Sequence, residues 1–217
     1  MPVMDCSQCE GIEAKFNQKY VNKKIKKYLK DGPKKTTLCL MRALQSEDIQ
    51  GMTLLDIGGG LGDIQHALLK SGVSHAVNVE GSNAYVEACE AEAQRQGHAG
   101  RIRHLHGDFV SLAGDVPSVD IVTLDRVICC YHDMPQLVNL SAQKARRFYG
   151  VVYPRDARWV KLAMLIYYNL RHWLQRNPMR NFVHPTGAVE AILRENGLER
   201  LFYREMGPWQ VVVFARQ

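Results

Sequence analysis

From Thr36 onward, short apolar runs alternate with amphipathic segments long enough to form helices. The apolar runs that we expect to be strands are residues 52–57, 75–79, 102–106, 120–124 and 148–153. The helices expected among them cover residues 36–45, 62–70, 83–96 and 134–147. Strands that alternate with helices are typical of a parallel sheet that carries helices on both faces.

The last forty residues depart from this alternation. Residues 199–204 and 209–215 both have strand character, and Met206-Gly207-Pro208 between them is a turn signal. A helix over 186–195, with Thr186 as its N-cap, precedes them. We therefore expect an α/β fold with a mostly parallel, seven-stranded sheet that ends in an antiparallel hairpin.

The N-terminal segment is strongly basic. Nine lysines lie between Lys15 and Lys35, and Phe16, Tyr20, Ile25 and Tyr28 recur among them at helical spacing. We favour an amphipathic helix packed on the domain. The alternative is a basic lid or arm that contacts phosphate, nucleic acid or an anionic membrane surface. We predict an arm over residues 1–35 and one domain over residues 36–217.

The composition excludes a wholly disordered chain and a fibrous protein. The chain has 217 residues, of which 46% are hydrophobic and 23% charged, as in an average globular domain. No apolar stretch is long enough to span a membrane, and no export leader opens the sequence, so we expect a cytoplasmic protein. In that compartment, the six cysteines are better interpreted as free thiols or metal ligands than as disulfides. The net charge of +6 permits an anionic partner without requiring one.

A glycine-rich loop follows the first expected strand of the sheet. Asp56 precedes Gly58-x-Gly60-x-Gly62, and this loop opens a helix whose N-terminus carries partial positive charge. Glu80 ends the next strand, where a carboxylate can accept hydrogen bonds from both hydroxyls of a ribose. Asp108 ends the third strand and can accept an adenine amino group.

These elements, in this order, resemble the class I S-adenosylmethionine-dependent methyltransferases. The resemblance covers Thr36 to the C-terminus, and it implies a Rossmann-like sheet and the cofactor S-adenosylmethionine. The closing hairpin also distinguishes that family from dehydrogenases. The cofactor-binding residues that the resemblance implies are Asp56, Gly58, Gly59, Gly60, Gly62, Glu80, Gly81, Ser82, Gly107, Asp108, Phe109, Asp125 and Arg126.

In that family, the segment after the fourth strand passes beside the reactive methyl group. His132 is our candidate base because its intrinsic pKa lies near neutrality. Tyr131 is the candidate that orients an acceptor, and Cys130 either lines the methyl pocket or acts as a nucleophile. The alternatives are that Cys129 and Cys130 are small buried hydrophobes and that His132 only caps the next helix.

A long insertion, at about residues 154–183, follows the fifth strand. In the family, an insertion here usually covers the acceptor pocket, and its aromatic residues suit a flat or apolar acceptor. Ordinary packing and a dimer interface are the alternatives. The predicted acceptor-contacting residues are Tyr153, Arg155, Trp159, Tyr167, Tyr168 and His184.

The layout is also similar to that of the magnesium-protoporphyrin O-methyltransferases. The shared features are a basic N-terminal helix, the glycine loop, the insertion and the hairpin. Two departures are Cys129-Cys130, where many small-molecule enzymes of the superfamily carry a histidine pair, and Cys6-x-x-Cys9 near the N-terminus. One C-x-x-C pair supplies half of the four ligands of structural zinc, so we expect no metal site.

The expected activity is methyl transfer to a small molecule, at a carboxylate or hydroxyl oxygen of an aromatic or apolar compound such as a tetrapyrrole. A small thiol or another soft nucleophile is one alternative acceptor. RNA, held by the lysine-rich arm, is another, although the Asn/Asp-Pro-Pro-aromatic motif of enzymes that methylate nucleic-acid amino groups is absent after the fourth strand.

Overall fold

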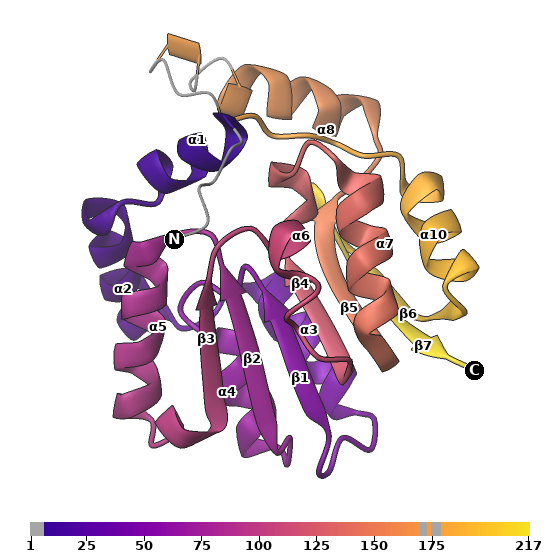
Figure 1. Ribbon diagram of the computed structural model, residues 1–217. Coiled ribbons are helices and arrows are strands. Elements are labelled where there is room, and N and C mark those ends of the chain that lie inside the picture. The colour runs from indigo at the N-terminus through magenta and orange to yellow at the C-terminus, as the bar shows by residue number, and fades with distance from the viewer. Residues whose placement is uncertain (1–6, 170–172, 175–178) are drawn as a thin grey trace.

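A seven-stranded sheet forms the centre of the molecule (Figure 1). The computed structural model describes residues 7–169, 173–174 and 179–217. The strand order is β3-β2-β1-β4-β5-β7-β6. Strand β7 runs antiparallel to both β5 and β6, and the other adjacent pairs are parallel. The strands are β1 (Thr53–Ile57), β2 (His75–Glu80), β3 (Ile102–His106), β4 (Val119–Asp125), β5 (Ala145–Pro154), β6 (Leu198–Met206) and β7 (Trp209–Arg216).

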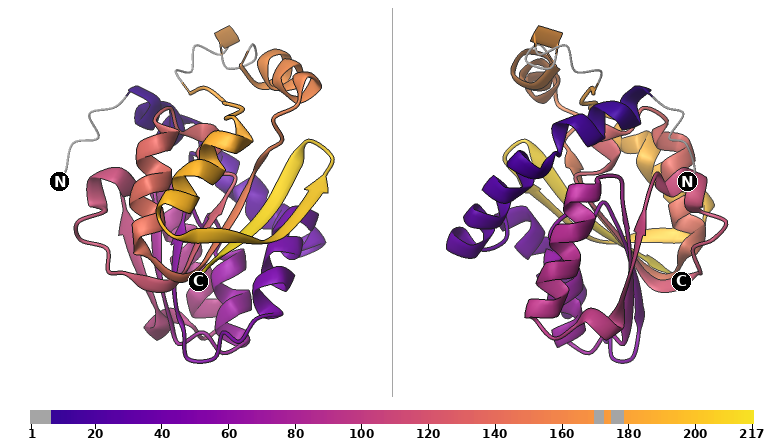
Figure 2. Two further views of the ribbon diagram at one scale, coloured as in Figure 1. Left: turned by 90° about the vertical axis from the view of Figure 1, so that its right-hand side faces the viewer. Right: turned by 60° about the vertical axis from the view of Figure 1, so that its left-hand side comes forward.

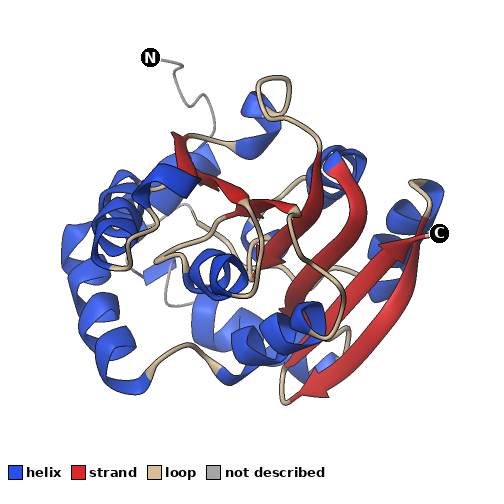
Figure 3. Ribbon diagram, turned by 90° about the horizontal axis from the view of Figure 1, so that it is seen from below, coloured by secondary structure: helices blue, strands red, loops and turns tan. Residues whose placement is uncertain are grey.

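Helices cover both faces of this sheet, as Figure 3 shows along the strands. On one face lie α3 (Lys35–Gln45), α4 (Asp63–Lys70) and α5 (Asn83–Arg95). On the other lie α6 (Phe109–Leu112), α7 (Met134–Lys144) and α10 (Thr186–Glu195). Because both faces are covered, the central strands are apolar along their length, which is why they are apparent in the sequence.

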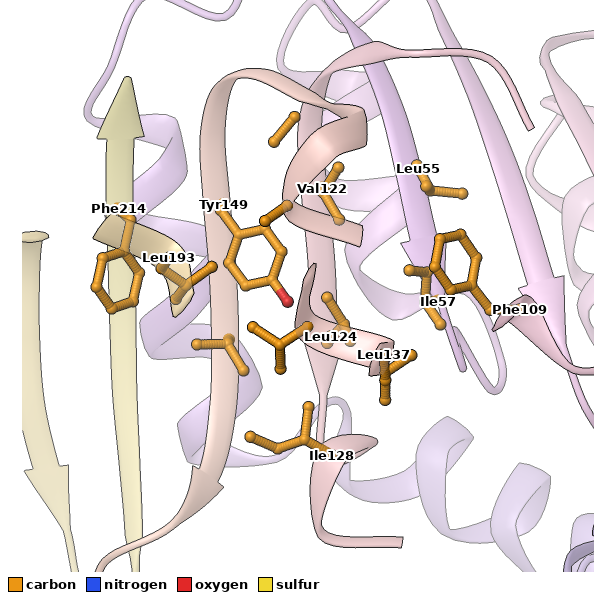
Figure 4. Close-up of a cluster of buried hydrophobic side chains, with 14 of the residues drawn as sticks. Leu55, Ile57, Phe109, Val122, Leu124, Ile128, Leu137, Tyr149, Leu193 and Phe214 are labelled. Carbon is orange, nitrogen blue, oxygen red and sulfur yellow. The ribbon is translucent and has the colours of Figure 1, made fainter. Parts of the chain in front are cut away.

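The larger core lies between the sheet and the α7 side (Figure 4). Leu124, Tyr149 and Phe214 come from β4, β5 and β7, and they belong to the same buried cluster as Leu137 of α7 and Leu193 of α10. Tyr149 has no exposed surface, and its hydroxyl pairs with Ser141 Oγ at 2.9 Å. Burial of this polar group is therefore compensated by a hydrogen bond.

The predicted elements are present, with two local corrections. The helix expected to run to residue 147 ends at Lys144, because Ala145 is extended and pairs with Val119 in the sheet. The expected N-cap, Thr186, is instead the first residue of α10, after Pro185. Its hydroxyl accepts a hydrogen bond from Gln210 Nε2 at 2.9 Å, so it joins the helix to β7.

The basic segment forms α1 (Ser7–Lys15) and α2 (Gln18–Asp31). Asn17 caps α2 by accepting a hydrogen bond from the Tyr20 backbone N–H. The α2 helix packs on α5 through the fully buried Val21, and its lysines face outward. The division into an arm (1–35) and a domain (36–217) with an insertion (154–183) stays a prediction.

In the described ranges, no helix combines the length and the apolar character needed to cross a bilayer. A cytoplasmic location stays a prediction.

Candidate functional site

The glycine loop lies where β1 ends and α4 begins. Gly58 donates its N–H to the Val79 carbonyl of β2 at 2.7 Å, and Gly62 serves as the N-cap of α4. Gly60 has φ of 57°, and a Cβ there would meet nothing nearer than Tyr85 Cε1 at 3.8 Å. A left-handed backbone that faces open space favours glycine, and it leaves room for a ligand against the main chain.

Beneath the loop, Asp56 forms a buried polar network. Its carboxylate accepts hydrogen bonds from Thr123 Oγ1 at 2.7 Å and Gln65 Nε2 at 3.0 Å. Burial raises the pKa of this carboxyl to about 7 despite those donors. A Cβ at Gly59 would lie 2.6 Å from both Asp56 Oδ2 and Asn78 Oδ1. Asp56 and Gly59 therefore support the loop from below.

Glu80 connects the end of β2 to the loop. It is 6% exposed, and its two oxygens accept the backbone N–H groups of Gly60 and Ser82, each at 3.1 Å. Burial outweighs these hydrogen bonds and raises the pKa of the carboxyl to about 7. Gly60 and Glu80, which are twenty positions apart in the sequence, are therefore joined at the end of β2. Gly81 lies between Glu80 and Ser82 in the chain.

The third predicted acid, Asp108, lies at the end of β3 after Gly107. It caps α6 by accepting the Ser111 N–H at 3.2 Å, and it also accepts the Tyr131 hydroxyl at 3.1 Å. Phe109 is 3% exposed and its side chain packs in the core (Figure 4). A contact between Phe109 and a ligand would therefore fall to its backbone, because the first N–H groups of a helix have no intrahelical partner.

A charged cluster lies near the start of α4. Asp63 Oδ1 is buried and accepts no hydrogen bond from the described residues. Asp125 lies 3.8 Å from Arg126 Nη1 through its Oδ1 and accepts the Thr37 hydroxyl at its Oδ2. Burial, and then the charge of Asp125, raises the pKa of Asp63 to about 6. Lys34 is exposed as a whole residue, but partial desolvation of its ammonium, and then the charge of Arg126, lowers its pKa to about 8. Lys34 and Asp63 are absent from the predicted site residues.

Arg126 has an unusual backbone. Its φ is 62°, which makes it the one non-glycine residue with positive φ in the described part of the chain. Its guanidinium lies 5.0 Å from the Trp209 ring centroid and contacts the Thr36 hydroxyl. Strained conformations of this kind concentrate at functional sites.

The candidate catalytic residues lie on or just after η2 (Ile128–Cys130). His132 is exposed, and its ring stacks on Tyr131 with centroids 5.3 Å apart. Tyr131 donates its hydroxyl to Asp108, which joins the catalytic segment to the end of β3. The thiols of Cys129 and Cys130 lie 3.8 Å apart; their mutual hydrogen bond lowers the pKa of Cys130 and raises that of Cys129.

The end of the insertion packs directly on this catalytic segment. Phe182 donates its N–H to the Cys129 carbonyl at 2.7 Å, and His184 Nε2 bonds the Ile128 carbonyl at 2.8 Å. Burial lowers the pKa of His184, which favours a neutral ring that donates from Nε2. His184 therefore connects the two regions that the sequence assigns to acceptor binding and to catalysis.

The other predicted acceptor residues have different surroundings. Tyr153 is fully buried in the core, and Arg155 pairs with Glu205 at the hairpin. Trp159, on α8 (Arg158–Ala163), is 52% exposed. Tyr167 and Tyr168 belong to the π-helical turn η3 (Met164–Asn169), and their side chains are outside the described structure. Cys6 and the Cys9 side chain are also outside it.

The α1 helix contacts the residues that follow Glu80, a contact that was not predicted from the sequence. Glu13 Oε2 accepts the Asn83 N–H at 3.2 Å, and the Phe16 carbonyl accepts the Ser82 hydroxyl at 2.8 Å. The α1 helix thus crosses the carboxyl ends of β2 and β3, next to Glu80 (Figure 2). Nothing in the spacing of α1 residues indicates this contact, because it depends on how the arm docks.

Residues 6–146 match the family model of the O-methyltransferase domain. The chain belongs to this family. The recognition of a class I S-adenosylmethionine-dependent methyltransferase is confirmed, and S-adenosylmethionine is the cofactor that the family uses.

Among curated proteins, the chain is 31% identical over 108 residues to the ribosomal protein L11 methyltransferase of Yersinia pseudotuberculosis. The match covers 48% of this chain and 34% of that protein, so the chain spans about a third of the length of the curated relatives it matches.

Solved structures confirm the fold along nearly the whole chain. Magnesium protoporphyrin IX methyltransferase from Synechocystis PCC 6803, with bound S-adenosylhomocysteine, has a TM-score of 0.73 at 15% identity, covering 95% of this chain and 98% of that one. The methyltransferase in complex with the Trm112 activator of Haloferax volcanii has a TM-score of 0.69 at 14% identity, covering 94% and 96%. The predicted Rossmann-like sheet with its terminal hairpin is therefore confirmed.

Proposed function

We propose that this protein transfers the methyl group of S-adenosylmethionine to a carboxylate or hydroxyl oxygen of an aromatic or apolar small molecule. The observation that carries the proposal is the buried Glu80 carboxylate, hydrogen-bonded to Gly60 in a loop that is open on its outer side. Two oxygens at the end of β2 suit the two hydroxyls of a ribose.

The cluster beyond the loop fits the amino-acid part of the same cofactor. Asp63 Oδ1 is buried and accepts no hydrogen bond from the described residues, so it is suited to an ammonium group, because a buried carboxylate oxygen without a donor is costly. The Lys34 ammonium is suited to a carboxylate, and the α4 N-terminus adds partial positive charge beside it. The residues present therefore match a ligand that carries both charges.

When bound, S-adenosylmethionine supplies an electrophilic methyl group on a sulfonium sulfur. Glu80, Asp63 and Lys34 then orient the ligand, and positioning accounts for much of the rate in a displacement of this kind. A carboxylate acceptor is already deprotonated near neutral pH and needs no base. A hydroxyl acceptor would give its proton to His132, which is exposed at the end of the catalytic segment.

One observation favours a second candidate, a soft acceptor such as a small thiol. The Cys130 thiol lies 3.7 Å from Asn181 Oδ1, where the insertion meets the catalytic segment, and its pKa is lowered. A polarisable sulfur atom in the wall is compatible with a sulfur acceptor. The oxygen acceptor is preferred because the chain belongs to the O-methyltransferase family.

The first test is isothermal titration with S-adenosylmethionine and S-adenosylhomocysteine, with NAD as the control ligand. We expect micromolar binding of both sulfur compounds and none of NAD; no binding of either would overturn the proposal. An assay with radiolabelled methyl donor then compares porphyrin carboxylates, hydroxylated aromatics, small thiols and RNA. Label on a carboxylate or hydroxyl supports the oxygen proposal, and label only on thiols or RNA contradicts it.

A further inference from the structure

The largest exposed apolar feature in the described structure is on the insertion. Six large apolar side chains within sixteen residues are each more than half exposed, from 52% for Trp159 to 69% for Leu174. We call them the insertion patch: Trp159, Leu162, Leu165, Ile166, Trp173 and Leu174. Large apolar side chains that are concentrated on one exposed segment are typical of a binding surface.

The patch is not the inward face of a helix that packs on the core. Val160 and Met164, on the same segment, are buried and already attach α8 and η3 to the domain. Trp159, Leu162 and Ile166 follow at spacings of three and four, so they share the opposite face. The segment is therefore apolar on both faces, and packing explains only one of them.

Positive charge accompanies the patch. Figures 1 and 2 draw α8 and α1 at the same end of the molecule, and α2 continues from α1 along the flank. Most α2 lysines are exposed, and from Lys15 to Lys35 nine lysines accompany one acid, Asp31. Among the described residues, Lys27 and Asp31 form the one ion pair within α2.

We propose that the insertion patch docks this protein on the surface of an anionic lipid bilayer. Tryptophan together with leucine and isoleucine inserts at the level of the headgroups, and lysines nearby attract anionic lipids. A second copy of the chain fits less well, because each copy carries a net charge of +6 and a basic α2. A bilayer supplies both the apolar interior and the negative charge.

The inference does not depend on methyl transfer, and its test separates the two. Purified full-length protein is sedimented with vesicles of phosphatidylcholine alone or with 30 mol% phosphatidylserine, a proportion on the order of that in anionic membrane leaflets. We expect at least tenfold stronger binding to the anionic vesicles, and weakening as salt rises.

Two variants then separate the contribution of the insertion patch from that of the α2 lysines. Leu162→Ser/Leu165→Ser/Ile166→Ser should lower vesicle binding at least tenfold while S-adenosylmethionine affinity, measured by titration, stays unchanged. Lys23→Gln/Lys26→Gln/Lys27→Gln should remove the preference for anionic vesicles. Leu201→Ser is the matched control, because Leu201 is 49% exposed on the edge strand β6, and it should bind vesicles like the wild type.

Three outcomes would overturn the proposal. The first is no binding of the wild type to anionic vesicles, and the second is equal binding by the triple serine variant. The third is a dimer, seen by analytical ultracentrifugation, that the serine substitutions abolish while vesicles leave the protein in solution. If vesicle binding fails while S-adenosylmethionine still binds, the methyltransferase proposal stands alone.

Discussion

The cofactor side and the acceptor side of this molecule are built in different ways. Around the glycine loop, Glu80 and Asp56 are buried. Glu80 accepts two backbone hydrogen bonds, and Asp56 accepts two side-chain hydrogen bonds. On the insertion, Trp159 and its neighbours present apolar surface to water. We propose that the ligand common to the whole family is held by backbone and strand ends, and that the choice of acceptor depends on an inserted segment that the sheet does not constrain.

The comparison predicts its largest effect at Glu80. Glu80→Gln removes the charge that would accept the ribose hydroxyls, and hydrogen bonds to charged groups contribute about 1.5–3 kcal/mol. S-adenosylhomocysteine affinity should fall about 100-fold in isothermal titration. Glu90→Gln, an exposed acid on α5, is the control and should bind normally. Equal S-adenosylhomocysteine affinity in the two variants would show that Glu80 does not bind the cofactor.

The next effect concerns the support beneath the loop. In Gly59→Ala, the added methyl group meets Asp56, Gln65 and Asn78, and overpacking costs about 1–3 kcal/mol. Urea denaturation should show this loss of unfolding free energy. Gly100→Ala is the matched control, because a Cβ at Gly100 meets no atom within 4 Å. Similar stability of the two variants would contradict a tightly packed loop.

A smaller effect is expected from pH. The folded pKa of Glu80 is raised to about 7, so its carboxyl is mostly protonated at pH 6 and mostly ionised at pH 8. Ribose hydroxyls donate best to the ionised form, so cofactor affinity should rise about tenfold over this interval. Glu80→Gln should flatten the titration curve. An affinity that falls as pH rises in the wild type would refute the role of the carboxylate.

The smallest effect is expected at Trp159, and it should distinguish acceptor binding from cofactor binding. Trp159→Ala should leave cofactor affinity unchanged and lower kcat/KM for an apolar acceptor about fivefold, equivalent to about 1 kcal/mol of lost apolar contact. Steady-state kinetics measures the change, with Leu201→Ala on β6 as the control. A loss of cofactor affinity in Trp159→Ala would mean that the two sides are coupled.

Much of the cofactor side is predictable because its signals are local. Glu80 is the last residue of one buried strand, and Gly58, Gly60 and Gly62 follow another, so the order of parallel strands suffices to bring them together. Lys34 and Asp63 were not predicted. In the sequence, Asp63 is an ordinary acid in the first turn of a helix, and Lys34 is one of nine lysines. Only the structure shows that the side-chain charges of both residues are partly desolvated.

The sheet, the loop and the family can be predicted from the sequence, because periodicity and strand-end residues report short-range geometry. Only the folded structure reveals that α1 crosses the end of β2, that His184 bonds the Ile128 carbonyl, and that the Phe109 side chain packs in the core. It also reveals which apolar residues of the insertion remain exposed. The physical reason is that burial and pairing depend on contacts between segments distant in the chain, and no local pattern encodes them.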